Sequence, residues 1–421
     1  MPDEERRLSY LLFILRHWRL LGFGFLLTMF SSFGQTYYVS LFSAEFRDAF
    51  GLGHGGFGLV YSLATLASAA CLVWLGRLID HMDLRWYAGF ACAGLVAACF
   101  VTAAVPSAVW LTLAIFLLRL TCQGLMSHTA VTTMARYFEA ERGRAVSVAQ
   151  LGYAVGRAAF PVGAVLVVAA VGWRQTWTLT GIALGVLLVP AVLWLLRGQA
   201  ERHRAHIARL QRISTDAGAA ARQWSRADVL RDPRFYLLMP VTLASAFITT
   251  GLVFHQVHLV AAKGWDLTWF VGAFVLFSIA TTVAALIAGP VIDRHGAVRL
   301  LPYFLLPMAA SLVLLAYADH AVVVPVYMIA TGISSGASMT IAGTLWAEIY
   351  GVRHLGAIRA VTSALTVFAS ALSPVAMGGL LDVGVSIEAI ALMCVGYIAA
   401  ATALLAAPSL RADRMARREP A

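Results

Sequence analysis

The chain has 421 residues, of which 60% are hydrophobic and 12% are charged, and its formal net charge is +10. Soluble domains are about half apolar and about a quarter charged, so this composition excludes an ordinary soluble protein. Apolar runs such as LLGFGFLLTMF lack the alternation of membrane β-barrel strands, which leaves a polytopic helical membrane protein. The five cysteines lie in apolar runs without metal-ligand spacing, so we expect no metal site and no cofactor.

Twelve apolar segments long enough to cross a hydrocarbon layer of about 30 Å follow one another along the chain. We expect spans at residues 20–43, 55–78, 86–105, 108–137, 144–171, 175–196, 234–261, 267–290, 298–318, 321–348, 357–382 and 385–407. The expected parts are an N-terminal six-helix bundle (1–196), a polar cytoplasmic linker (197–233), a C-terminal six-helix bundle (234–407) and a basic tail (408–421). A short interfacial helix near residues 8–18 is expected to lead into the first span.

Basic residues are distributed unevenly between the loops. With both termini in the cytoplasm, 26 of the 31 Lys and Arg residues fall in cytoplasmic segments, and the outer segments hold only Arg47, Arg174 and Lys263. Cytoplasmic loops carry an excess of Lys and Arg, so we expect a multi-pass protein of the plasma (inner) membrane with cytoplasmic termini. The net charge then lies beside anionic lipid, and no nucleic-acid partner is needed to explain it.

One segment of the chain occurs twice. GRLIDHMDLRW begins at Gly76, and GPVIDRHGAVR begins 213 residues later at Gly289. The same offset relates Asp80 to Asp293, Tyr137 to Tyr350, Gly143 to Gly356 and Pro161 to Pro374. A constant offset over five landmarks predicts two parallel six-helix repeats, with a substrate site near mid-membrane between them and transport by rocking of the halves.

The repeated segments resemble the G-x-[LV]-x-D-[RK]-x-G-x-[RK]-[RK] motif of the major facilitator superfamily, which follows its second and eighth spans. The residues that match are Gly76, Asp80 and Arg85 in the first copy and Gly289, Asp293, Arg294, Gly296 and Arg299 in the second. His81 and Asp83 stand where a basic residue and a glycine are usual. The resemblance implies an all-α membrane protein of twelve transmembrane helices in two pseudo-symmetric bundles, acting as a transporter.

In that family the motif aspartate latches the cytoplasmic side of the protein. We therefore expect Asp80 to pair with Arg136 or with the start of the eleventh span, and Asp293 with Arg359 or with the start of the fifth. The junctions ARYFEAERGRAVSVAQLGYAVG and AEIYGVRHLGAIRAV are also similar to those of the monocarboxylate and oxalate/formate porters. Those porters place a key basic residue in the eighth span, where this chain has Ser278, Thr281 and Thr282 and no basic residue.

Two arginines are expected near mid-membrane. Arg119 and Arg157 stand about eleven and thirteen residues inside their spans, or about 15–20 Å deep at ~1.5 Å per residue. An arginine there costs at least about 2.5–3.5 kcal/mol and cannot lose its proton. All Asp and Glu residues lie near span ends or in loops, so the pair is suited to a small anionic substrate such as a carboxylate. For Arg119, in LLRLTCQG, helix packing or proton coupling remains an alternative.

Other polar residues in the spans complete the predicted site. We expect Gln35 and Tyr38 of the first span to line the cavity with the arginines. His128 and His255 are candidates for proton coupling, because histidine is the side chain that changes charge near pH 7. For each histidine a structural hydrogen-bonded role is the alternative.

Rival function classes fit the sequence less well. GISSG at 332–336 matches G-x-S-x-G, but it lies in an apolar helix where Gly332 and Gly336 indicate close helix packing, so we expect no enzyme activity. A receptor would carry a soluble domain, and no segment is large enough for one. We expect a transporter of a small organic anion that acts as a monomer. The alternative is an exporter of drugs or other hydrophobic compounds by proton antiport.

Overall fold

The computed structural model describes residues 2–80, 82–138, 141–197, 226–351 and 355–405. Helices form the regular structure of these ranges, and no strand occurs in them. Eleven of their helices are long and apolar enough to span a membrane, and a shorter apolar helix, Leu306–Tyr317, adds to them. The predicted all-helical membrane fold is therefore confirmed. Most of the predicted linker and the predicted tail lie outside the described residues.

The chain divides into two compact units, Met1–Glu45 with Leu63–Ala219 and Phe46–Ser62 with Ala220–Ala421. Helices of the N-terminal half are α1 (Pro2–Phe30), η1 (Ser31–Gly34), α2 (Thr36–Val39), η2 (Ser40–Phe42), α3 (Ser43–Phe50), α4 (His54–Leu75), η3 (Gly76–Asp80), α5 (Leu84–Ala103), α6 (Ala108–Leu118), η4 (Arg119–Met126), α7 (Ser127–Tyr137), α8 (Arg142–Val171), α9 (Trp173–Ala183), η5 (Leu184–Leu188) and α10 (Val189–Leu195). Helices of the C-terminal half are α12 (Arg226–Arg231), α13 (Pro233–Phe254), α14 (Gln256–Ala262), α15 (Leu267–Gly272), α16 (Phe274–His295), α17 (Ala297–Leu300), α18 (Leu306–Tyr317), α19 (Val323–Tyr350), α20 (Leu355–Asp382) and α21 (Ile387–Leu404). Helix α4 thus begins in the second unit and ends in the first.

The structure divides or merges some of the predicted elements. The expected ninth span, 298–318, is divided into α17 and α18, because Pro302 and Pro307 lack the amide that would continue a helix, and Pro307 stands at the start of α18. The expected interfacial helix near residues 8–18 is not a separate element, since α1 runs unbroken from Pro2 to Phe30.

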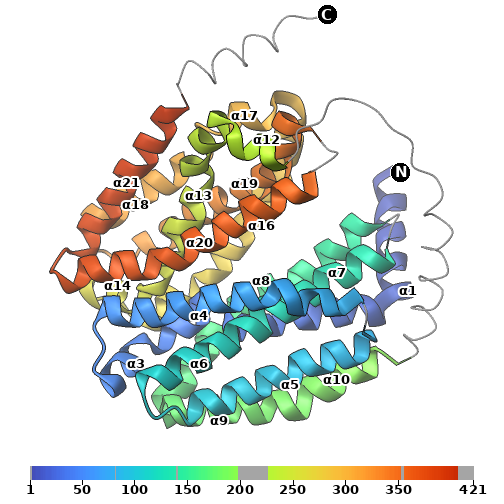
Figure 1. Cartoon of the computed structure of the whole chain (residues 1–421), viewed down its shortest axis with the longest axis horizontal. Coiled ribbons are helices and arrows are strands. Elements are labelled where there is room, and N and C mark those ends of the chain that lie inside the picture. Colours follow the sequence, from blue (N-terminus) through green and yellow to red (C-terminus); the bar gives the residue numbers. More distant parts are fainter. Residues whose placement is uncertain (1, 81, 139–140, 198–225, 352–354, 406–421) are drawn as a thin grey trace, which may run out of the picture. The chain divides into compact units, whose positions relative to one another are not determined.

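In the first unit, α1 packs along α8 and α5 packs along α9 (Figure 1). Glycines on α8 permit the first of these contacts. A Cβ added at Gly152 would overlap the carbonyl oxygen of Phe25, and one at Gly156 would overlap that of Met29. The two helix backbones therefore touch, as small residues allow in membrane bundles.

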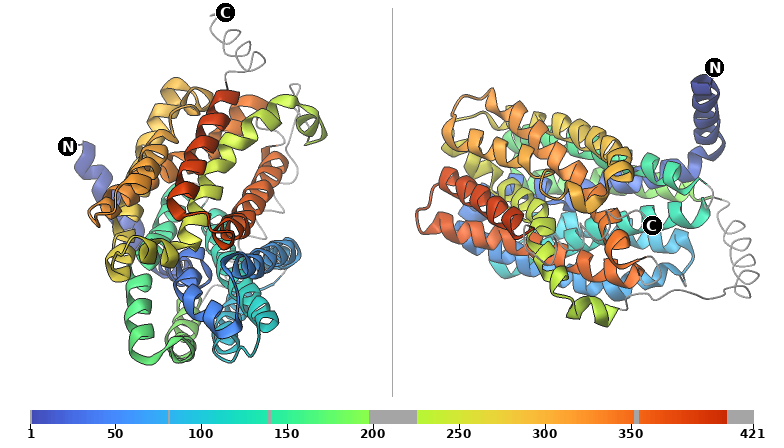
Figure 2. Two further views of the ribbon diagram at one scale, coloured as in Figure 1. Left: turned by 90° about the vertical axis from the view of Figure 1, so that its left-hand side faces the viewer. Right: turned by 90° about the horizontal axis from the view of Figure 1, so that it is seen from above.

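In the second unit, α13 packs along α20, α16 along α19, and α18 along both α19 and α21 (Figure 2). The first and fifth spans of one unit and the seventh and eleventh of the other thus pair in the same way. Gly332 and Gly336 lie against backbone carbonyls of α16, so their predicted packing role is confirmed. Ser334 between them is buried, and its Oγ accepts a hydrogen bond from the Met308 amide at 3.0 Å.

Candidate functional site

The first span is interrupted near its middle. Helix α1 ends at Phe30, the short turn η1 follows, and Gln35 has an extended backbone (φ −82°, ψ 154°) before α2 begins. Irregular backbone at membrane depth is tolerated only where it is buried in protein or lines a cavity, and transporter sites are commonly built at such helix breaks. The break therefore marks a candidate site, and η1 contacts both η4 and α8.

Arg119 lies on one side of this break. It begins η4, a π-helical turn of the kind often found at functional sites. Its Nη1 donates a hydrogen bond to the Gly34 carbonyl at 3.1 Å, and only 3% of the side chain surface is exposed. This contact ties the fourth span to the interrupted first span and supports the packing alternative for Arg119.

Arg157 of α8 lies on the other side of the break and is half-buried. Its Cζ is 4.5 Å from the ring centre of Tyr153 and 5.4 Å from that of Tyr37. The Tyr37 hydroxyl donates to Ser32 Oγ at 2.8 Å. Sequence reasoning missed Tyr153 and Ser32 as site residues, although Tyr153 stands four residues before Arg157, the spacing that places side chains on one helix face.

Gln35 and Tyr38 are both buried. Gln35 precedes α2 at the break itself. The Tyr38 ring packs in an aromatic cluster, 4.8 Å from Phe33 and 5.7 Å from Trp177 between ring centres. The structure therefore brings Arg157, Tyr37 and Tyr153 together and places the Tyr38 ring among aromatic side chains.

His128 of α7 lies beside the first motif rather than at the helix break. It lines a cavity of about 310 Å³ together with Gly76 and Arg77, and its Nε2 is 3.5 Å from Thr132 Oγ1. His255 belongs to the second unit, where its Nε2 is 3.1 Å from the Pro374 carbonyl oxygen. Neither predicted coupling histidine shares a described contact with Arg157.

In the first motif, Arg136 donates from Nη1 to the Ile79 carbonyl at 3.1 Å, next to Asp80, whose side chain lies outside the described residues. Asp83 caps α5 by accepting a hydrogen bond from the Arg85 amide at 2.8 Å. Arg85 itself donates from Nε to the Leu196 carbonyl at 2.9 Å. The first motif thus joins the third, fourth and sixth spans.

The second motif is built differently. Gly296, at the position equivalent to Asp83, has a φ of +80°, which favours glycine. The amide of the next residue, Ala297, donates instead to Glu348 Oε2 of α19 at 2.6 Å. In the first motif, Asp83 caps the following helix with its own carboxylate. In the second motif, Gly296 has no carboxylate, and Glu348 caps the following helix instead. This difference explains why aspartate stands in place of glycine in the first copy.

Asp293 was expected to pair with Arg359 or with the start of the fifth span, and the second pairing stays a prediction. Asp293 and Arg359 are both exposed, and no ion pair joins them in the described part of the chain. Arg294 and Arg299 are exposed as well, and a Cβ added at Gly289 would meet no atom within 4 Å. The acidic residue that contacts this motif in the described structure is Glu348. The sequence identified Glu348 only as a carboxylate near a span end.

Replacing Glu348 with alanine is expected to lower the melting temperature of the purified protein by about 2–4 °C, because losing a helix cap costs about 1 kcal/mol. Glu141→Ala is the matched control, since Glu141 forms a 3.7 Å ion pair with Arg144 that is exposed on both sides. Such pairs contribute little, so this control should leave the melting temperature unchanged. Equal melting temperatures for the two variants would contradict the capping role.

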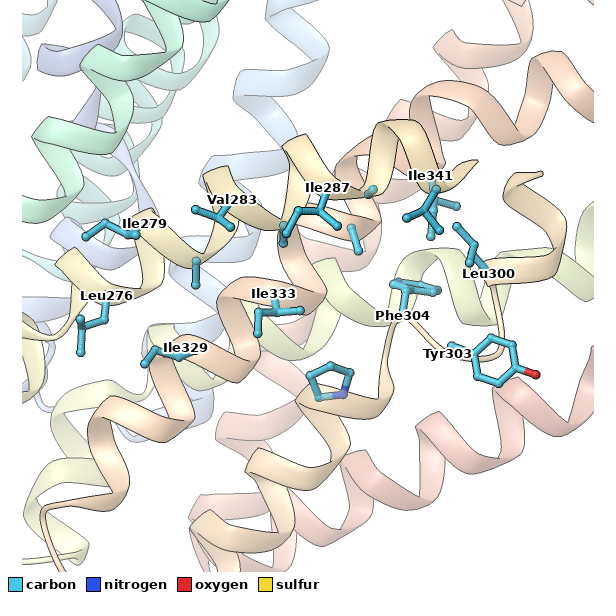
Figure 3. A pocket seen from close by; sticks show the side chains of 16 residues that line it. Leu276, Ile279, Val283, Ile287, Leu300, Tyr303, Phe304, Ile329, Ile333 and Ile341 are labelled. Carbon is cyan, nitrogen blue, oxygen red and sulfur yellow. The ribbon is translucent and has the colours of Figure 1, made fainter. Parts of the chain in front are cut away.

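A separate groove on the second unit is almost entirely apolar, with the Tyr303 hydroxyl as a polar group of its lining (Figure 3). Helices α16, α18 and α19 supply most of its lining, and its volume is about 560 Å³. Lining residues such as Ile279 and Ile287 are exposed, as on a surface that faces lipid. With no charged lining residue, this groove is unsuited to an anion.

Comparison with known proteins places the fold. The family model of the Major Facilitator Superfamily matches residues 24–276, more than half of the chain. A bacterial homologue of the human lysosomal transporter Spinster, in an inward-facing and occupied conformation, is similar in structure (TM-score 0.66, 16% identity, 93% of this chain and 96% of that one). The nucleoside transporter NupG is similar as well (TM-score 0.69, 15% identity, 93% and 98%). No curated protein sequence matches the chain. The chain belongs to the Major Facilitator Superfamily and is a transporter rather than an enzyme.

Proposed function

We propose that the protein carries a small organic anion, best matched by a carboxylate, across the plasma membrane as a monomeric secondary active transporter that works by alternating access. The observation that carries this proposal is the half-buried guanidinium of Arg157 beside the break in the first span. Arg157 is the proposed anion ligand, and Arg119 is assigned the role of holding the broken helix against the fourth span.

The surroundings of Arg157 support an ionic ligand. A cation over an aromatic face gains about 0.5–2 kcal/mol, so Tyr37 and Tyr153 together offset much of the cost of about 2.5–3.5 kcal/mol of an arginine at this depth. Tyr37 and Tyr153 also hydrogen-bond with the guanidinium, whose five N–H donors leave further donors for a carboxylate. A charge stabilised in this way can exchange one anion for another without a fixed carboxylate partner.

The carboxylate assignment has two further supports and one competitor. The local resemblance to monocarboxylate and oxalate/formate porters favours a carboxylate, although the eighth span lacks their basic residue. The structural similarity to NupG makes a neutral nucleoside the competing cargo. Nothing specific favours a drug-export role on the same fold.

The proposed orientation places both termini in the cytoplasm and Arg47, Arg174 and Lys263 at the outer face. The contacts of Arg174 suit a residue that anchors the end of a span at the membrane–water interface. Its two Nη atoms donate to the carbonyls of Ala103 and Val105 at 2.8 and 2.9 Å, and its Cζ lies 4.2 Å from the Trp173 ring centre. Aromatic and basic residues commonly anchor span ends at this level.

Uptake into proteoliposomes tests the proposal. The purified protein is reconstituted and offered a panel of labelled small carboxylates, a labelled nucleoside and a lipophilic cation, each with and without an imposed pH gradient and membrane potential. We expect carboxylate uptake above that of empty vesicles, competed by unlabelled carboxylates. Uptake of the nucleoside or the cation with no carboxylate uptake would overturn the anion assignment.

A further inference from the structure

The start of α4 is held by the end of α20. The His54 amide donates to Asp382 Oδ1 at 2.7 Å, and the Gly55 amide donates to Oδ2 at 2.8 Å. A Cβ added at Gly53 or Gly55 would come within 3 Å of this carboxylate, so the glycines provide the room for it. A carboxylate at a helix N-terminus satisfies free amides and meets the positive end of the helix dipole.

The same residue, His54, makes a second contact that reveals its protonation state. Its Nε2 is 3.1 Å from Nη1 of Arg47 on α3. A guanidinium can only donate hydrogen bonds, so Nε2 must accept, and the imidazole must be neutral with its proton on Nδ1. Protonation of Nε2 would replace this hydrogen bond with repulsion between two cations.

Two more histidines surround this ring. The His54 ring centre is 4.5 Å from that of His258 and 5.8 Å from that of His255. His255 Nε2 lies 3.1 Å from the Pro374 carbonyl oxygen, which can only accept, so this nitrogen carries a proton and His255 serves as a donor to α20.

The fixed charges that face the histidines nearly balance. Arg47 and Asp382 face His54, and Arg47 and Glu388 face His258. Glu388 is held at 3.2 Å by Lys263, which also contacts Asp319 at 2.6 Å. Burial disfavours the Lys263 ammonium, but its hydrogen bonds to the two carboxylates outweigh this effect and raise its pKa.

This cluster lies where α4 passes from one unit to the other. Residues 54–62 belong to the second unit and residues 63–75 to the first. Further contacts hold the first part of α4 to α20, since Ser62 Oγ donates to the Ala371 carbonyl and Gly58 lies against Pro374. These contacts all lie within the second unit, so the first part of α4 is fixed to α20, while the rest of the helix belongs to the first unit.

We propose that His54 is a proton-binding site at which acid outside the membrane releases α4 from α20; the inference rests on the proposed transport cycle and its orientation. Protonation breaks the Arg47 contact and adds an imidazolium that competes with the α4 amides for Asp382. The lost cap and the added repulsion both favour detachment of the start of α4. The exposed position of Asp382 gives protons from the outer solution access to the cluster.

Distance measurement between two spin labels tests this inference without any substrate. The labels are attached through Ala49→Cys on α3 and Val383→Cys after α20, both exposed positions, in a protein whose half-buried Cys71 is replaced by serine. The other native cysteines, Cys92, Cys99, Cys122 and Cys394, are buried. In lipid, the fraction of long distances is expected to rise about threefold or more as the pH falls from about 8 to about 4, because the cation of Arg47 opposes protonation of His54 until the solution is more acidic than a free histidine requires.

Three variants make the result specific. His54→Gln keeps a hydrogen-bond acceptor but cannot take a charge, so it should hold the short distance at both pH values. Asp382→Asn weakens the cap and should raise the long-distance fraction at both. His320→Gln, at an exposed outer-loop histidine, should respond to pH like the parent protein. The inference is overturned if the distances in the parent protein do not respond to pH, or if His54→Gln responds to pH like the parent. A failure of carboxylate uptake alone would contradict only the proposed substrate.

Discussion

Replacing Arg157 with glutamine is expected to lower anion uptake into proteoliposomes about tenfold or more. A hydrogen bond to a charged group contributes about 1.5–3 kcal/mol, and 1.4 kcal/mol corresponds to a factor of ten in binding. Glutamine retains a polar side chain at the helix break but is shorter and supplies no charge to an anion beside Tyr37 and Tyr153. The measurement is the initial rate of labelled uptake at several substrate concentrations.

Two controls distinguish a ligand from a merely structural arginine. Arg157→Lys keeps the charge but loses the planar fork, so it should retain part of the uptake at a raised half-saturating concentration. Arg174→Gln removes an arginine that donates to the backbone carbonyls of Ala103 and Val105 and is not part of the helix break, so its transport should remain near that of the parent. Full uptake by Arg157→Gln, or equal losses of uptake in Arg157→Gln and Arg174→Gln, would show that Arg157 does not bind the anion.

Replacing Gly156 with leucine is expected to prevent normal assembly of the first unit. A side chain at this position would enter the backbone of α1 at Met29 and meet Ser32, which is part of the break beside Arg157. Overpacking costs about 1–3 kcal/mol and sometimes more, and each kcal/mol changes the ratio of folded to unfolded protein about fivefold. Size-exclusion chromatography of a fluorescent fusion should show a correspondingly smaller monodisperse peak.

The same helix supplies the matched control. Gly163 lies seven residues further along α8, is exposed, and has no atom within 4 Å of an added Cβ. Gly163→Leu makes the same chemical change at a position with no packed neighbour, so its monodisperse peak should match that of the parent. Similar peaks for the two variants would show that contact between α1 and α8 does not depend on a missing side chain.

Much of the fold could be predicted because the bilayer imposes length and hydrophobicity on every span. The constant offset of 213 residues anticipated the matching helix pairs, and the four-residue spacing of Gly332 and Gly336 anticipated their packing on α16. The division of the ninth span between α17 and α18 was missed because apolar residues continue through Pro302 and Pro307. The hydropathy of a segment indicates whether it lies in lipid or in water. It does not indicate whether the backbone hydrogen bonds of a helix continue through the segment.

The candidate site was anticipated only in part. Arg157 stood out because a permanent charge in an apolar run is costly, and that argument needs no structure. The break after Phe30 was not anticipated, since SSFGQ interrupts neither the length nor the apolar character of the first span. The contact between His54 and Asp382, 328 positions apart in the chain, was beyond any local pattern.

Composition and the internal repeat by themselves determined that this chain is a helical membrane transporter of two related halves, because burial in hydrocarbon acts on each segment separately. Only the tertiary structure decided which charged groups share partners. It placed Arg119 against a carbonyl, Arg157 between tyrosine faces and Asp382 on the amides of α4. Electrostatic and hydrogen-bonding energies depend on distances of a few ångströms between remote segments, and a linear sequence does not contain those distances.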